Sequence, residues 1–140
     1  MENNKQVVHI SATVKAPVEK VWKYWNGPEH IVQWNSAGGG WHCPRATNDL
    51  RVGGKISSRM ESADGSEGFD FEGTYDLVKE KEEIAYTLGD GRKVHIRFRE
   101  DNGITHITES FEAENTFPVE MQQQGWQAIL DNFKGYTENN

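Results

Sequence analysis

The chain has 140 residues, a net charge of −7 at pH 7 and a single cysteine. This length fits one domain, residues 1–140, and is enough to bury a core without disulfides. No stretch approaches the ~20 apolar residues of a membrane span, and the N-terminus lacks the apolar run of a secretory signal. With one cysteine and no such signal, we expect a cytoplasmic protein. An acidic chain without a basic face also argues against nucleic-acid binding.

The first part of the chain predicts a strand and two short helices. Apolar and polar residues alternate over residues 7–14, which is typical of a strand with one buried side. Pro17 suits the first turn of a helix, and Gly27 ends that helix. Pro28 then opens a second short helix that runs to about Trp34.

The segment from Ser36 to Asn48 is the least regular part of the sequence. Three successive glycines, residues 38–40, argue against a stable element there. The segment also carries Trp41, His42 and Cys43. Adjacent His and Cys side chains rarely point towards each other, and neither CxxC nor HxxxH spacing accompanies them. We therefore predict a loop with an aromatic tip, without a nucleophile pair and without a metal site.

The remaining chain predicts a run of hairpin-linked strands followed by one long helix. Period-2 alternation marks five consecutive strands, at residues 55–61, 69–78, 84–88, 94–98 and 105–111. From Pro118 to Tyr136, apolar residues recur with helical spacing. The anchoring face of this helix is predicted to comprise Trp126, Ile129, Leu130 and Phe133, and its thinner half Met121, Gly125 and Ala128.

These elements define an α+β fold of the helix-grip type. A curved antiparallel sheet of about six strands wraps around the long C-terminal helix, and the two short helices follow strand 1. Such a sheet and helix can either close into a packed core or leave a cavity between them.

The order of several segments resembles a known family. APVEKVWKYW, DLRVGGKI, FEGTYDLV, EEIAYTL and GWQAILDNFKGY, between Val7 and Tyr136, resemble the START-like SRPBCC superfamily. More narrowly, they are similar to the branch homologous to the C-terminal domain of Aha, the activator of the heat-shock-protein-ninety ATPase. The positions that match are Pro17, Val21, Trp22, Gly53, Gly54, Gly73, Tyr75, Gly125 and Trp126. The segment Ser36 to Asn48 departs from the family pattern.

The resemblance implies the helix-grip fold and a site between sheet and helix. Most members bind hydrophobic or amphipathic small molecules there, and some are cyclases, dehydratases or hydrolases. The N-terminal domain of the chaperone activator has no counterpart in the sequence, so direct activation of a chaperone is not expected.

Strand alternation and the thin side of the helix predict which residues line a cavity. Apolar walls with a few polar groups are what a small-molecule pocket needs. The alternative is that the same residues form a collapsed core. The predicted lining comprises Trp34, Ile56, Ser58, Met60, Phe69, Phe71, Tyr75, Tyr86, Ile96, Phe98, Glu109, Met121, Gly125 and Ala128.

Glu109 is the sharpest polar anomaly, because it shares a strand face with Ile107 and Phe111. A carboxyl group in an apolar cavity would have a raised pKa and could orient a ligand or move a proton. The alternatives are a bulge that turns Glu109 outward, or an ion pair with Arg59 or Arg97.

Three functional hypotheses follow. The first is a non-enzymatic, stress-related binder of a hydrophobic or aromatic small molecule, with no cofactor and no metal. The second is an enzyme on the same fold with Glu109 as acid or base. The third is an interaction module, which binds a chaperone or forms a homodimer through its sheet or the Trp41 segment.

Overall fold

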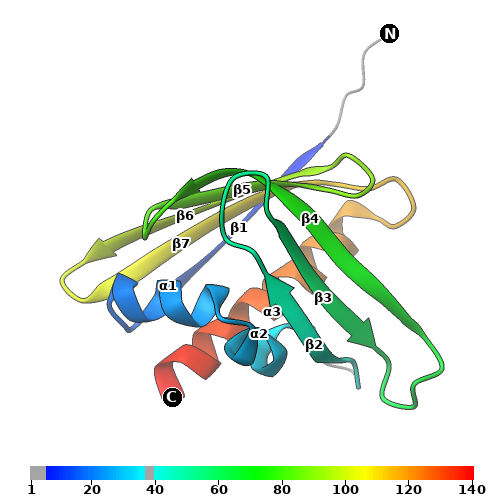
Figure 1. Ribbon diagram of the computed structural model, residues 1–140, viewed down its shortest axis with the longest axis horizontal. Helices are drawn as coiled ribbons and strands as arrows, with labels where there is room; N and C mark the ends of the chain where they lie inside the picture. The colour runs from blue at the N-terminus through cyan, green and yellow to red at the C-terminus, as the bar shows by residue number, and fades with distance from the viewer. Residues whose placement is uncertain (1–5, 37–39) are drawn as a thin grey trace, which may run out of the picture.

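A computed structural model describes residues 6–36 and 40–140. Residues 1–5 and 37–39, which include two of the three successive glycines, lie outside the described residues. The predicted helix-grip fold is confirmed (Figure 1). In chain order its elements are β1 (Val7–Val14), α1 (Val18–Asn26), α2 (Pro28–Trp34), β2 (His42–Asn48), β3 (Lys55–Glu61), β4 (Gly68–Lys79), β5 (Glu83–Leu88), β6 (Lys93–Asp101), β7 (Ile104–Glu112) and α3 (Val119–Asn139).

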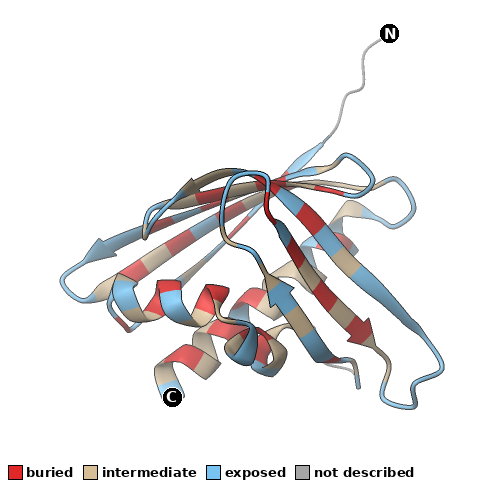
Figure 2. Cartoon of the chain, viewed as in Figure 1, coloured by how far each residue is buried: buried red, intermediate tan, exposed pale blue. Residues whose placement is uncertain are grey.

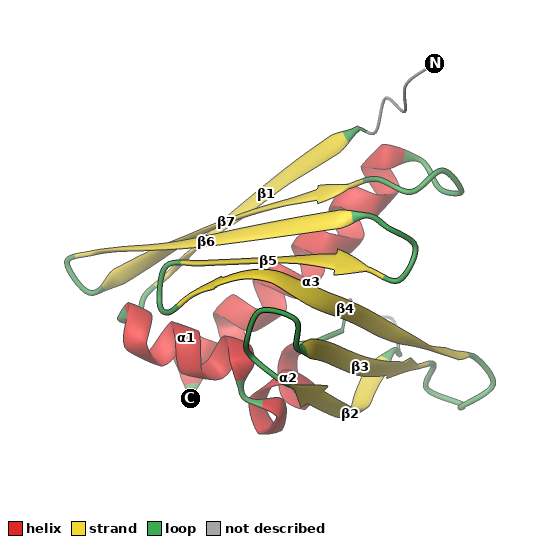
Figure 3. Cartoon of the chain, turned by 45° about the horizontal axis from the view of Figure 1, so that its top comes forward, coloured by secondary structure: helices red, strands yellow, loops and turns green. Residues whose placement is uncertain are grey.

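The seven strands form one antiparallel sheet in the order β1-β7-β6-β5-β4-β3-β2. The sheet curls, and all three helices lie on its inner side (Figure 3). Along β1, β3, β5, β6 and β7, buried positions alternate with more exposed ones, so the inner face packs and the outer face meets water (Figure 2). Within the described residues, no helix is both long and apolar enough to cross a membrane.

The sheet has one strand more than the alternation predicts. The extra strand, β2, lies within the segment that the sequence assigns to an irregular loop. It forms one edge of the sheet and pairs with β3, and its register shifts between His42 and Arg45. Pro44 falls in that irregularity, where the missing N–H is tolerated. Cys43 is buried and His42 is exposed, so the two side chains form no common site.

Aromatic rings close the end of the fold where α1 and α2 meet the C-terminal half of α3. Phe133 of α3 has no exposed surface and stands edge-on to Trp25 and Trp34, with ring centroids 4.8 and 5.0 Å away. Trp22 and Trp25 both meet Phe98 of β6 edge-on. These interlocked rings fix the helices to the sheet.

The inward face of α3 differs from the predicted face in its N-terminal half. Gln122 is buried and continues the face of Trp126, whereas Met121 is 56% exposed. The Gln122 side chain accepts a hydrogen bond from the N–H of Glu114 and donates to the carbonyls of Glu114 and Phe117. A pattern of apolar residues misses this position, because a glutamine occupies it.

Candidate functional site

A cavity of about 360 Å³ lies between the sheet and the N-terminal half of α3. Its walls come from strands β3, β4, β5 and β7, from helices α1, α2 and α3, and from the loop that precedes α3. The lining is mostly apolar and rich in aromatic rings. It comprises Trp25, Ile31, Trp34, Asn35, Ile56, Ser58, Met60, Phe69, Phe71, Tyr86, Arg92, Glu109, Glu114, Phe117, Gln122, Trp126, Ile129 and Leu130.

Most of the predicted strand residues line this cavity. Strand alternation places them inward, and the curl of the sheet brings them around one space. The predicted residues found in the lining are Trp34, Ile56, Ser58, Met60, Phe69, Phe71, Tyr86 and Glu109.

Three predicted strand residues lie outside the lining. Ile96 has no exposed surface, and Phe98 is covered by the rings of Trp22 and Trp25. Tyr75 is buried and donates a hydrogen bond to Asn48 Oδ1 at 2.6 Å. All three side chains are buried, as an inward orientation predicts, but Phe98 packs against rings of α1 and Tyr75 bonds to the end of β2.

The three predicted residues of the thin helix half also lie outside the lining. Met121, Gly125 and Ala128 are displaced from it because Gln122, Trp126 and Ile129 form the inward face. A Cβ atom added at Gly125 would meet nothing within 4 Å. An alanine at Gly125 would therefore fit without a clash, and Gly125 itself does not line the cavity.

Trp126 forms an aromatic wall with the sheet. Its ring stacks on Phe111, with centroids 4.0 Å apart and planes 10° from parallel. Phe71 meets Trp126 edge-on at 6.1 Å and Tyr86 edge-on at 6.3 Å. Stacked and edge-on aromatic rings around a cavity are suited to binding an apolar or aromatic ligand.

Glu109 lies inside the cavity wall and is 7% exposed. Its register partners on β1 and β6 are Ile10 and Ile96, so both neighbours on the inner face are apolar. Within the described residues, no hydrogen bond or ion pair reaches its carboxyl group, and the predicted alternatives of an outward bulge or an arginine partner are wrong. Burial raises its pKa to about 8, so the group is mostly neutral at pH 7.

Two further polar groups of the inner face lack strong partners. The Ser58 hydroxyl is buried, and its polar neighbour is the Cys43 thiol, a weak hydrogen-bonding group. Burial, and secondly the nearby Glu109 carboxylate, raise the pKa of Tyr86. Hydroxyl groups without strong protein partners are available to a guest molecule.

Half-exposed aromatic residues mark the rim of the cavity. Phe69 on β4 is 52% exposed and Phe117, before α3, is 56% exposed. The predicted aromatic tip, Trp41, is partly buried and lies 6.0 Å from Phe69 between ring centroids. Two charged residues of the lining have partners of their own. Arg92 pairs with Asp90, and Glu114 accepts the N–H groups of Thr116 and Phe117.

Sequence reasoning missed several lining residues for a common reason. The helix residues, such as Trp25, Trp126 and Ile129, have apolar patterns that do not separate packing from lining. The polar rim residues Arg92 and Glu114 lie in or beside turns, where alternation gives no direction. Only the spacing of Gln122 could have predicted that it faces inward, because it lies one helical turn before Trp126.

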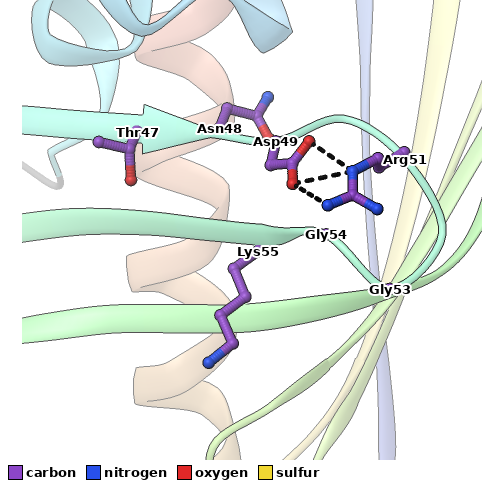
Figure 4. Close-up of a pocket in the computed structure, with 7 residues that line it drawn as sticks. All are labelled: Thr47, Asn48, Asp49, Arg51, Gly53, Gly54 and Lys55. Carbon is purple, nitrogen blue, oxygen red and sulfur yellow. Dashed lines mark hydrogen bonds and ion pairs between the residues drawn. The ribbon is translucent and has the colours of Figure 1, made fainter.

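A second hollow, of about 510 Å³, lies outside the core along the loop between β2 and β3. Figure 4 shows Arg51 turned towards Asp49, and their side chains form an ion pair at 3.0 Å. Gly54 is required there, since an added Cβ would meet the Asp49 carbonyl at 2.1 Å. This glycine is structural, and Asp49 and Arg51 of the hollow pair with each other.

Metal-binding side chains do not converge in the described part of the chain. Residues 6–36 and 40–140 contain no group of three or more His, Cys, Asp or Glu side chains that could hold a metal ion.

The chain is similar to several solved structures. A Cytophaga hutchinsonii protein is 54% identical, with a TM-score of 0.82, over 99% of this chain and 94% of that one. An AHSA1-like protein from Aeromonas hydrophila is 40% identical, with a TM-score of 0.89, over 96% and 93% of the two chains. A Chromobacterium violaceum protein, 20% identical, shares the fold with a TM-score of 0.86 over 96% and 99%.

No curated protein matches the chain. Residues 15–138, in contrast, match the family described as Activator of Hsp90 ATPase homolog 1-like protein. The match spans the helices, the cavity strands and α3, and the protein therefore belongs to this AHSA1-like family.

Proposed function

We propose that the protein binds a hydrophobic or aromatic small molecule in the cavity beneath α3, without chemical conversion. The observation that carries this proposal is a mostly apolar cavity, open at one rim, that holds a buried carboxyl group without a partner in the described residues. A core selected only for stability would fill such a space or pair the group, because both features lower stability. Family membership supports the same reading, since helix-grip proteins commonly use this space for ligands.

The test is a thermal-shift screen with a library of apolar and aromatic compounds. A ligand that binds only the folded protein adds about 2.7 kcal/mol at a hundred times its Kd, which raises the Tm by several degrees. We expect several compounds to raise the Tm of the wild-type protein. A screen in which no compound does so would overturn the proposal.

Two neighbouring serines supply a matched pair of variants. Ser58→Leu places a larger side chain in the cavity. Ser57→Leu makes the same change at the preceding position, which does not line the cavity and where Ser57 Oγ donates to Glu72 at 3.4 Å. Compounds that stabilise the wild type should also stabilise Ser57→Leu but not Ser58→Leu. Quenching of tryptophan fluorescence gives a second readout, because Trp25, Trp34 and Trp126 line the cavity.

A second candidate is an enzyme on the same scaffold, and the inward position of Glu109 favours it. A carboxyl group with a pKa of about 8 can donate or accept a proton near neutral pH. Once a ligand is identified, mass spectrometry of the bound molecule after prolonged incubation separates the two functions. Chemical conversion that Glu109→Gln abolishes would favour the enzyme, and recovery of the intact ligand would favour the binder.

A further inference from the structure

A buried carboxyl group, that of Glu109, lines the otherwise mostly apolar cavity. The carboxyl group is more than nine-tenths buried, lines the cavity and has no protein partner within the described residues. Burying such a group without a hydrogen bond costs free energy, and a ligand that supplies the bond recovers it. The group therefore decides which polar function a tightly bound ligand can carry.

Within residues 6–36 and 40–140, no charged side chain contributes to the raised pKa of Glu109, which burial alone causes. Ile10 on β1 and Ile96 on β6 flank it, and α3 presents Trp126, Ile129 and Leu130 to the same cavity. Tyr86 on β5 is neutral, since burial raises its pKa.

The remaining charged groups near this part of the sheet are either paired or on the other side. Of the lining residues, Arg92 forms an ion pair with Asp90. Glu114 accepts hydrogen bonds from backbone N–H groups. His95 and Arg97 alternate with the inward residues of β6, so they lie on the outer face, where Glu83 pairs with both.

We propose that the cavity selects an apolar or aromatic molecule that carries one basic amine, with the amine placed against Glu109 and the apolar body against Trp126 and Phe71. This inference rests on the proposed binding function and names the chemical class of its ligand. An ammonium group supplies both the hydrogen-bond donors and the charge that the buried carboxylate lacks. A ligand carboxylate would bring a second negative charge into the same apolar space.

Three naphthalene derivatives with different polar groups test the selectivity. The probes are 2-(1-naphthyl)ethylamine, 2-(1-naphthyl)ethanol and 1-naphthylacetic acid, with affinities measured by titration calorimetry at pH 8.5. A charge-assisted hydrogen bond corresponds to roughly ten- to a hundred-fold in affinity. We expect the amine to bind more tightly than the alcohol by this factor and the acid to bind most weakly.

Proton release provides a readout that packing alone does not produce. Below a pKa of about 8, free Glu109 holds a proton and the free amine holds another, whereas the bound pair shares one. Binding of the amine at pH 7 should therefore release close to one proton, measured by calorimetry in buffers of different ionisation enthalpy. Its affinity should rise about tenfold per pH unit up to pH 8, while the affinity of the alcohol stays constant.

Glu109→Gln keeps the size and hydrogen-bonding capacity of the side chain but does not ionise. In this variant the preference for the amine over the alcohol and the proton release should both disappear, while the alcohol still binds. Thermal unfolding of the variant confirms that it is folded.

The outcomes separate the inference from the proposed function. If the alcohol binds but the amine binds no more tightly, or the acid binds best, the inference is wrong and the binding function stands. If Glu109→Gln retains the preference for the amine, another group makes the contact and the inference is again wrong. If none of the three probes binds while other library compounds do, the inference also fails. A library without any binder overturns both.

Discussion

The two halves of α3 cover the same sheet in opposite ways. In the C-terminal half, Phe133 is fully buried between Trp25 and Trp34, and ring edges meet ring faces. In the N-terminal half, Trp126 stacks on Phe111 and leaves a cavity beside it. Both halves use large aromatic residues, so composition does not distinguish them.

The two halves also differ in the kind of polar group that lacks a partner. Near the packed, C-terminal half it is the Thr137 hydroxyl, whereas the cavity beside the hollow, N-terminal half also holds the carboxyl group of Glu109. Near the packed half, the indole N–H of Trp34 donates to the Tyr24 carbonyl at 3.0 Å, and the Asn26 side chain donates to the Trp22 carbonyl at 2.9 Å. Around the cavity, Glu109 has no such bond within the described residues. The packed half therefore stabilises the fold, whereas the hollow half leaves a cavity and an unpartnered carboxyl group, both of which lower stability.

The largest loss of stability is expected from a substitution in the packed half of α3. Phe133→Ala removes a ring that touches both Trp25 and Trp34, and the rigid surroundings should leave a void. We expect a loss of about 3–5 kcal/mol in the free energy of unfolding, measured by urea denaturation. The exposed Met121→Ala serves as the control and should change stability by less than about 0.5 kcal/mol. A loss below 1 kcal/mol for Phe133→Ala would contradict the contrast between the halves.

Acid titration tests the hollow half next. Burial raises the folded-state pKa of Glu109 from 4.5 to about 8, so the folded protein holds a proton that the unfolded chain releases. Stability should therefore fall as the pH rises from about 4.5 to about 8, by on the order of 4 kcal/mol. The difference in stability between the wild type and Glu109→Gln, followed by denaturation at several pH values, isolates this effect from other groups. A difference that stays constant across this range would place the carboxylate in a solvated or paired environment.

The sequence predicts the fold and the inward position of Glu109 for the same physical reason. Period-2 alternation and helical spacing report which side of an element is buried, and Glu109 lies between Ile107 and Phe111 on a regular strand. The alternation of apolar and polar residues does not predict the buried face where an element is irregular or where an inward residue is polar. Strand β2 contains Pro44 and a register shift, and the inward face of α3 includes Gln122, which bonds to the loop before it. Which inward residues line a cavity depends on the position of α1 and α3, which local patterns do not report.

Trp126→Ala should cost less than Phe133→Ala although it removes a larger side chain. The indole is only partly buried, and its space joins an existing cavity, so fewer close contacts are lost. We expect a loss of about 2 kcal/mol in the free energy of unfolding, measured by urea denaturation. The variant should also bind apolar compounds more weakly, since the stacked wall is gone. A larger loss than that of Phe133→Ala would show that the hollow half, rather than the packed half, holds α3 on the sheet.

The smallest expected change in stability comes from a substitution at Gly125. It tests whether this residue lies on the cavity-lining face of α3, as predicted from the sequence, or outside it, as observed. Gly125 does not line the cavity, and an added Cβ there would meet nothing within 4 Å, so an alanine fits without strain. Gly125→Ala should therefore raise stability by about 0.5–1 kcal/mol, because alanine is the better helix former, and should leave ligand affinity unchanged. Gly73→Ala is the contrasting variant, since its Cβ would lie 2.8 Å from Tyr86 Cδ1, and it should lower stability. Denaturation and the thermal-shift assay measure both, and a loss of ligand binding in Gly125→Ala would return this position to the cavity wall.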